Sequence, residues 1–320
     1  MKVIIEPGTT GNVIATIAIG GDYYNSWEKY ALSTWKRYCE RHGLGLILFD
    51  KDMLSPTSNL WKKRQWQKLL IGDELLKNMP AVRNVCYLDT DILINYTASN
   101  VFDGYDEDKI SLVSQKNGLP YPIEGVLRRI AFFRHHFYSK DYPLDSSLFM
   151  SLENIYHYHD LRAQADYACT GFYVFNTRAH ALLMKSWFDK YDSTVTSITD
   201  GGEEAHVNYE LQNWGKITWM DYKWQALWIY EMAWKYPFLY HYGGNNKSLI
   251  RECIEASLFT NNFLHFAGSW HESGMWKIGG FLESDMQKNL LEGYCTYLDV
   301  PVAGEPKGVV KPKSQGKNSR

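Results

Sequence analysis

Residues 86–94 read Cys86-Tyr87-Leu88-Asp89-Thr90-Asp91-Ile92-Leu93-Ile94, an apolar strand pattern that runs into two carboxylates and then continues as a second apolar run. Side chains two residues apart on a strand share a face, about 6.6 Å apart at a rise of about 3.3 Å per residue. Asp89 and Asp91 can therefore reach one cation. Carboxylate oxygens suit Mg²⁺ or Mn²⁺, which take further ligands from water and from a substrate diphosphate.

The chain before this motif alternates strand-like and helix-like patterns. Strands are predicted at residues 12–19, 46–49 and 84–88, and helices between them at 27–38 and 59–79. Such a β-α-β-α-β order favours a parallel sheet whose binding crevice lies beyond the carboxyl ends of the strands. The motif stands at one of those ends.

The chain after the motif indicates a mixed α/β domain over residues 1–303. Residues 119–165, dense in aromatics, His and Arg, read as an inserted lobe over the sheet. The pattern further predicts strands at 110–114 and 171–175, an apolar piece at 265–266, and helices at 179–191, 203–214 and 285–298. The basic residues 304–320 contain almost no large apolar side chain, which predicts a disordered tail, at most a weak tether to an anionic membrane surface.

Composition excludes several classes of protein. The 320 residues are 45% hydrophobic and 22% charged, with a net charge of −2, which argues against a nucleic-acid partner. No run approaches the roughly 20 apolar residues that span a bilayer, and the first residues are too short a run for a signal peptide. The five cysteines form no C-x-x-C pair. A cytoplasmic, reducing location is expected.

An Asp-x-Asp pair occurs three times, so spacing alone does not identify a site. Asp50 and Asp52 also follow a strand, whereas Asp106 and Asp108 lie in a polar turn. Only Asp89 and Asp91 have apolar runs on both sides, although one of them could simply cap the next turn.

Residues 85–94 resemble the D-x-D segment of nucleotide-sugar glycosyltransferases with the GT-A fold. Four more segments resemble elements of that family in the same order, namely residues 15–24, 64–69, 170–177 and 265–270. The resemblance implies a Rossmann-like mixed central sheet flanked by helices, a nucleoside-diphosphate-sugar donor, most often a UDP-sugar, and Mn²⁺ or Mg²⁺ as cofactor. The last segment is similar to the glycogenin-like, retaining branch, in which its histidine, His265, is the third metal ligand beside Asp89 and Asp91.

The same resemblance implies roles for other residues. The donor and cofactor would be contacted by Ile19, Gly20, Asp22, Tyr24, Lys68, Asp89, Thr90, Gly171, Gly268 and His271, and the catalytic group would comprise Asp91, Glu204 and Lys277. The family has Lys-Pro-Trp after the glycine at position 268, whereas this chain has Trp270-His271-Glu272. The diphosphate contact therefore stays open between His271 and Lys277.

Alternatives remain at the level of residues and of function. Glu204 also suits a helix N-terminus electrostatically, and Tyr24 also suits a core position. The expected activity is transfer of a sugar to a hydroxyl of a glycan or other acceptor, and the glycogenin-like resemblance implies retention of configuration. One alternative is a haloacid-dehalogenase-type phosphatase with Asp89 as nucleophile. Another is a nucleotide-sugar-binding module without catalysis.

Overall fold

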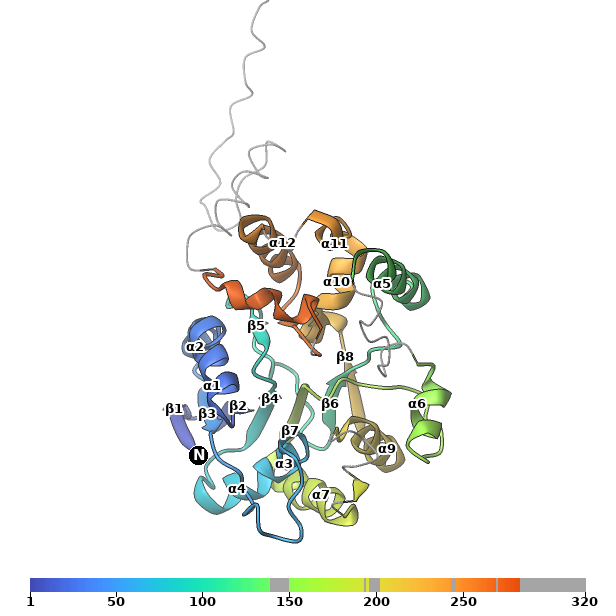
Figure 1. Ribbon diagram of the computed structural model, residues 1–320. Helices are drawn as coiled ribbons and strands as arrows, with labels where there is room; N and C mark the ends of the chain where they lie inside the picture. Colours follow the sequence, from blue (N-terminus) through green and yellow to red (C-terminus); the bar gives the residue numbers. More distant parts are fainter. Residues whose placement is uncertain (139–149, 193, 196–201, 243–245, 269, 283–320) are drawn as a thin grey trace, which may run out of the picture. The chain divides into compact units, whose positions relative to one another are not determined.

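A computed structural model describes residues 1–138, 150–192, 194–195, 202–242, 246–268 and 270–282 (Figure 1). The chain divides into two compact units, Met1–Gly279 and Gly280–Arg320, and the first holds every element discussed below. The helix predicted at residues 285–298 and the basic tail at 304–320 lie outside the described residues.

The first unit is built on a mixed seven-stranded sheet with the strand order β1-β3-β2-β4-β7-β6-β8. Its strands are β1 (Lys2–Ile5), β2 (Asn12–Ile17), β3 (Gly45–Phe49), β4 (Asn84–Leu88), β6 (Ile110–Val113), β7 (Phe172–Asn176) and β8 (Ile217–Met220). Strands β3, β2 and β4 are parallel, and β7 pairs antiparallel with β4. The predicted parallel nucleus and the mixed α/β class with helices around a central sheet are confirmed.

Helices surround this sheet. They are α1 (Gly21–Tyr30), α2 (Leu32–His42), α3 (Arg64–Gln67), α4 (Ile71–Asn78), α5 (Ile123–Phe137), α6 (Leu152–Tyr158), α7 (Thr177–Lys190), α9 (Glu204–Trp214), α10 (Trp228–Lys235), α11 (Leu239–Tyr242) and α12 (Lys247–Thr260), with the 3₁₀ segments η1 (Lys68–Leu70), η3 (Tyr222–Gln225) and η4 (Glu272–Ile278). Among the described residues, no helix is both long enough and apolar enough to cross a bilayer.

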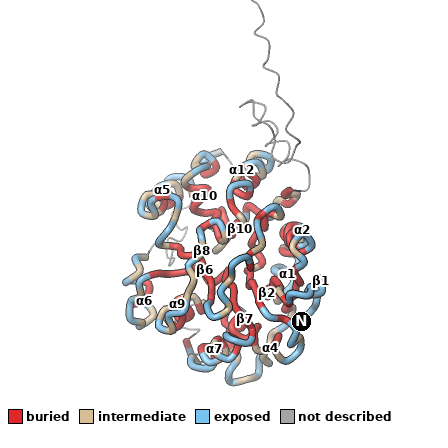
Figure 2. Tube along the Cα trace, turned by 180° about the vertical axis from the view of Figure 1, so that it is seen from behind, coloured by how far each residue is buried: buried red, intermediate tan, exposed pale blue. Residues whose placement is uncertain are grey.

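Strand β4 is buried on both faces, because helices pack on both sides of the sheet. Val85 and Tyr87 join one core cluster with residues of α4 and α7, and Cys86 and Leu88 point to the opposite face. In Figure 2 the buried colour accordingly follows the inner strands of the sheet, whereas the edge strands β1 and β8 are more exposed. A strand so enclosed has little freedom, so the residues that follow it are firmly placed.

The helix predicted at residues 27–38 is two helices, α1 and α2, that meet at Ala31. Trp27 and Trp35 are both fully buried, and their rings lie 5.6 Å apart. The apolar spacing therefore continues across the break, which is why the pattern alone predicts one helix. The helix predicted at 59–79 is also divided, into α3, η1 and α4. It begins at Arg64, later than predicted.

A second sheet of three strands, β5-β10-β9, lies beyond the carboxyl end of β4. It consists of β5 (Ile92–Ile94), β9 (Ala226–Leu227) and β10 (Phe263–His265). Strand β10 pairs antiparallel with β5 and parallel with β9, and it places His265 opposite Ile92. Helices α10 and α12 pack against this sheet (Figure 1).

Residues 119–165 do not form one separate body among the described residues. Helix α5 packs on α10 and α11, whereas α6 packs on α9. The Arg134 guanidinium on α5 forms a buried ion pair with Glu272 of η4, with Nε and Oε1 3.0 Å apart. This pair ties α5 to the segment that follows β10.

The contact between α4 and α7 depends on a glycine. A Cβ on Gly72 would lie 2.9 Å from Cβ of Ala181. Gly72→Ala should therefore lower the free energy of unfolding by about 1–3 kcal/mol through overpacking, although alanine gains about 1 kcal/mol in helix propensity. Denaturant titration measures the loss. Adding Ala181→Gly reopens the space and should recover part of the loss. A single variant as stable as the parent would contradict this close contact.

Candidate metal and donor site

Three side chains meet where the two sheets join. Asp89 and Asp91 follow β4, and His265 ends β10. One ligand atom from each of the three lies within 4.8 Å of the others. The His265 Nε2 atom is 3.2 Å from Oδ1 of Asp91. The structure thus brings together the three metal ligands that the resemblance implies.

Gly171 lies against both His265 and Asp89, and its lack of a side chain allows these two residues to approach each other. The Asp89 N–H donates to the Gly171 carbonyl oxygen at 2.8 Å. A Cβ on Gly171 would lie 2.4 Å from Cε1 of His265 and 2.7 Å from Oδ2 of Asp89. Any side chain here would push the imidazole and the carboxylate apart.

The donor set fits a divalent cation. Two carboxylates and one imidazole converge, which suits Mn²⁺ or Mg²⁺ better than a soft metal. For Nε2 of His265 to bind a cation, the ring proton must sit on Nδ1. Nδ1 lies 3.1 Å from the amide nitrogen of Gln225 and 3.6 Å from the Sγ of Cys169. The Cys169 sulfur, or the Gln225 amide oxygen after a flip of the amide, would then accept that proton.

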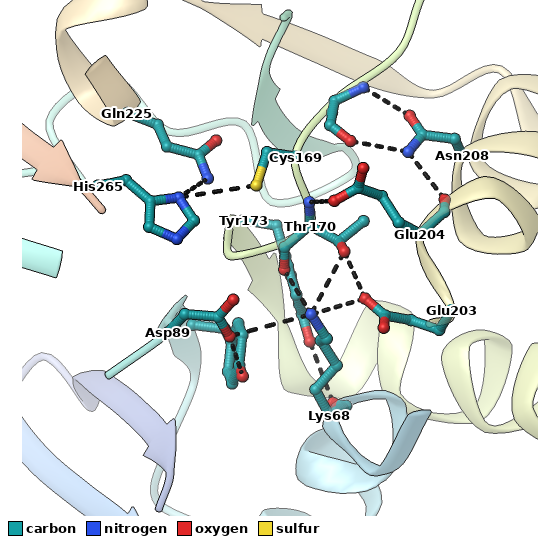
Figure 3. A network of polar contacts seen from close by, with 12 residues as sticks. Lys68, Asp89, Cys169, Thr170, Tyr173, Glu203, Glu204, Asn208, Gln225 and His265 are labelled. Atoms are coloured by element: carbon teal, nitrogen blue, oxygen red, sulfur yellow. Dashed lines mark hydrogen bonds and ion pairs between the residues drawn. The ribbon is translucent and has the colours of Figure 1, made fainter. Parts of the chain in front are cut away.

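The ammonium of Lys68 lies between Asp89 and Glu203 (Figure 3), and the side chain is almost fully buried. Its ammonium lies 2.7 Å from Oε1 of Glu203, 2.9 Å from the Thr170 carbonyl oxygen and 4.0 Å from Oδ1 of Asp89. Burial lowers the pKa of Lys68, but the charges of Asp89 and Glu203 outweigh burial and hold the pKa above its ordinary value. Lys68 is therefore a fixed positive charge between two acids.

Glu203 and Glu204 stand at the start of α9. The Glu203 carboxylate accepts from the Thr170 hydroxyl as well as from Lys68. Glu204 is partly buried, and its Oε2 accepts from the Thr170 N–H at 3.4 Å. Burial, and next the charge of Glu203, raise the pKa of Glu204 to about 7. Glu204 is thus able to hold or release a proton near neutral pH.

A cleft of about 430 Å³ opens on one side of Asp89. Its lining combines aromatic rings, cations and carboxylates, and it includes Ile17, Ile19, Tyr23, Asp52, Trp61, Lys63, Arg64, Gln65, Tyr87, Asp89, Thr90 and Asp91. Ile19, Thr90, Asp89 and Asp91 were expected to contact the donor or the metal, and they lie here. The Arg64 guanidinium donates to the Ile19 carbonyl oxygen beside Gly20, whose φ is +93°.

A second cavity, of about 650 Å³, opens on the other side of Asp89. Its lining includes Lys68, Thr170, Glu203 and Glu204. Asp89 and Gln65 line both spaces. Lys68 and Glu204, which the sequence predicts at the site, thus face the second cavity and not the first.

The remaining predicted residues do not line the first cleft. Asp22 is exposed on α1, and the Tyr24 hydroxyl donates to Glu28 at 2.7 Å. Gly268, with φ +93°, and the exposed His271 follow β10. Lys277 is also exposed, on η4. Burial raises the pKa of Asp91, but His265 and, at longer range, Lys277 lower it below its ordinary value. Of the two candidates for the diphosphate contact, the charge of Lys277 thus reaches a metal ligand.

Sequence reasoning missed several residues at the site. Tyr23, not Tyr24, lines the cleft, and it does so with Trp61. The helical pattern around residues 21–30 gives no means of choosing between adjacent tyrosines. Gln225 and Cys169 carry no motif at all, because their role depends on contact with His265 across the second sheet.

Comparisons with known proteins find similarity among solved structures and not among sequences. No protein-family model matches the sequence, and no curated protein is significantly similar to it. The fold is similar to a glycosyltransferase involved in glycosylation of the major capsid of PBCV-1, at 9% identity and a TM-score of 0.47, over 83% of this chain and 99% of that one. It is also similar to the bifunctional glycosyltransferase WbbM, at 10% identity and a TM-score of 0.47, over 91% of this chain and 52% of WbbM. At these values the likenesses carry no functional argument.

Replacing Gly171 tests the metal site without removing a ligand. Gly171→Ala should weaken Mn²⁺ binding about tenfold or more, because the methyl group displaces His265 and Asp89. Isothermal titration with Mn²⁺ measures the affinity. Gly274→Ala is the matched control, since a Cβ at Gly274 meets nothing within 4 Å. Equal Mn²⁺ affinity in both variants would mean that the three ligands do not bind the ion together.

Glu204 predicts a pH dependence of stability. Because folding raises the pKa of Glu204 to about 7, the folded state binds more protons than the unfolded state between the unfolded value and pH 7. The stabilisation is complete below pH 4.5 and is lost as the pH rises through about 7. Glu204→Gln should reduce the loss of unfolding free energy between pH 5 and pH 8 by about 1–3 kcal/mol. The exposed Glu153→Gln is the control. Parallel pH profiles for all three proteins would contradict the assignment.

Proposed function

We propose that this protein transfers a sugar from a nucleoside-diphosphate-sugar donor to a hydroxyl acceptor with the help of Mn²⁺ or Mg²⁺. The observation that carries the proposal is the convergence of Asp89, Asp91 and His265 at the end of a cleft that offers both aromatic rings and cations. A diphosphate needs a cation and positive side chains, and a nucleobase needs flat apolar surfaces.

The cleft suits the nucleotide half of the donor. Tyr23 is 61% exposed, so its ring is available for stacking on a base, and Trp61 lines the same space. Arg64 and Lys63 bring positive charge to the cleft. The resemblance to the GT-A family favours a UDP-sugar, and the cleft volume of about 430 Å³ lies within the range of small-ligand sites.

In the proposed reaction, the acceptor oxygen forms a bond to the anomeric carbon of the donor, and the bond from that carbon to the diphosphate oxygen breaks. The bonding pair leaves with the nucleoside diphosphate, and the hydroxyl proton passes to a donor phosphate oxygen or to a carboxylate such as Glu204. A bound divalent cation would supply positive charge that stabilises the departing diphosphate.

The protein's own residues would prepare this step. Asp89, Asp91 and His265 would hold the cation beside the diphosphate end of the donor, and Lys277 would add positive charge from η4. Lys68 holds Asp89 and Glu203 in place through the contacts described above. The glycogenin-like resemblance favours retention of the anomeric configuration, which the NMR spectrum of the product would report.

We further propose a reducing, cytoplasmic location. Four cysteines, Cys39, Cys86, Cys169 and Cys253, are buried free thiols among the described residues, as expected of a protein that folds without disulfides.

The decisive experiment combines donor binding with turnover. Thermal shifts are measured with UDP-, GDP-, CMP- and dTDP-sugars, each with and without Mn²⁺. A donor at a hundred times its dissociation constant should add about 2.7 kcal/mol to the unfolding free energy. Asp91→Asn should abolish the Mn²⁺-dependent part of the shift and the release of nucleoside diphosphate. Asp106→Asn, in the exposed Asp-x-Asp pair, is the matched control and should change neither.

Three results would overturn the proposal. The absence of an Mn²⁺-dependent shift with every donor would contradict the donor site. A phosphorylated protein trapped at Asp89 would instead indicate a phosphatase. Binding of a donor without turnover, whichever acceptor is added, would indicate a binding module.

A further inference from the structure

The second cavity begins where the donor cleft ends. Asp89 and Gln65 belong to both linings, and from them the cavity extends over α6 and the start of α9. Its volume of about 650 Å³ exceeds that of the donor cleft. A molecule bound there would meet the reactive end of a donor at Asp89.

The charges around this cavity disfavour an anion. Among the described residues that line it, Lys68 is the only Lys or Arg, and its ammonium is already held by Glu203 at 2.7 Å. Asp89, Glu203 and Glu204 supply carboxylates to the same lining. Lys116 lies outside the lining, and its ammonium donates to a backbone carbonyl at 3.2 Å. The wall therefore offers acceptors for hydroxyl groups and little for a phosphate or a carboxylate.

Two tyrosines belong to this lining, and only one of them is exposed. Tyr167 is buried, whereas Tyr158, the last residue of α6, is 62% exposed, so its ring is available to a ligand. The neighbouring His159 also lines the cavity, and burial lowers its pKa, so its imidazole is neutral at pH 7. An exposed ring beside hydroxyl acceptors matches a ligand with an apolar face and a polar edge.

We propose that this cavity binds the acceptor as a neutral sugar, whose C–H face packs on Tyr158 and whose hydroxyls bond to the carboxylates of α9. The inference rests on the proposed glycosyl transfer and specifies its acceptor. Acceptors whose reacting end carries a phosphate or a uronic acid should bind more weakly, because the one ammonium group among the described lining residues is already paired with Glu203.

Saturation-transfer NMR tests this inference directly on the full chain with diamagnetic Mg²⁺ and UDP present. The probes are the methyl glycosides of glucose, galactose, mannose and N-acetylglucosamine, together with glucuronate and glucose 6-phosphate. At least one neutral glycoside should bind, and both anions should bind about tenfold more weakly or not at all. Tyr158→Ala should weaken that binding about tenfold, and Tyr158→Phe should keep it, because the ring and not the hydroxyl makes the contact.

Phe238→Ala is the matched control, since Phe238 is an exposed aromatic residue outside the cavity lining, and it should bind the sugar as the parent does. Thermal melting of each variant shows that it is folded. The inference is overturned if no neutral glycoside binds at millimolar concentration, if the anions bind better, or if Tyr158→Ala binds like the parent. Mn²⁺-dependent UDP binding by the parent protein is measured separately. If UDP does not bind, the proposed function is rejected. If UDP binds and the glycosides do not, only the inference about the acceptor is rejected.

Discussion

The antiparallel pairing of β10 with β5 is the contact on which the candidate site depends. It is only three residues long, yet it sets His265 opposite Ile92, the residue after Asp91. The N–H of Phe266 donates to the Asp91 carbonyl oxygen at 3.0 Å and extends the ladder past the imidazole. Backbone bonds thereby hold a histidine from late in the chain beside carboxylates from its first third. The side-chain geometry is a consequence of strand register, and a slip by one residue would turn the imidazole to the other face.

The carboxylates around Asp89 make many hydrogen bonds and ion pairs because their negative charges must be balanced. Carboxylates gather on both sides of Asp89, and like charges at close range destabilise a fold unless partners balance them. Lys68 balances Asp89 and Glu203 through short contacts, and hydrogen bonds from Tyr87 and Thr170 satisfy further oxygens. At Asp91 the balancing partner is the imidazole of His265, and a divalent cation would displace the proton between the two side chains.

Much of this arrangement could be predicted from the sequence, because it follows from local patterns. The strands at 84–88 and 172–176 and the position of Asp89 at a strand end follow from apolar runs and strand geometry. The family resemblance supplied His265, which spacing alone does not. The second sheet was not predicted, since β9 and β10 are two and three residues long and owe their form to pairing with distant residues. Gln225 and Tyr158 could not be found for a similar reason, because only tertiary packing sets their neighbours.

Asp89 and Gln65 belong to the linings of both cavities, and this contact between the two spaces bears on the order in which two substrates bind. Because the two spaces share these residues, a molecule seated in the smaller one would border the larger one and could complete the surface that its occupant meets. Arrival in the reverse sequence would leave the second molecule without that surface. A compulsory order of addition, nucleotide first, would then arise from the shape of one partition, with no moving part and no separate regulator.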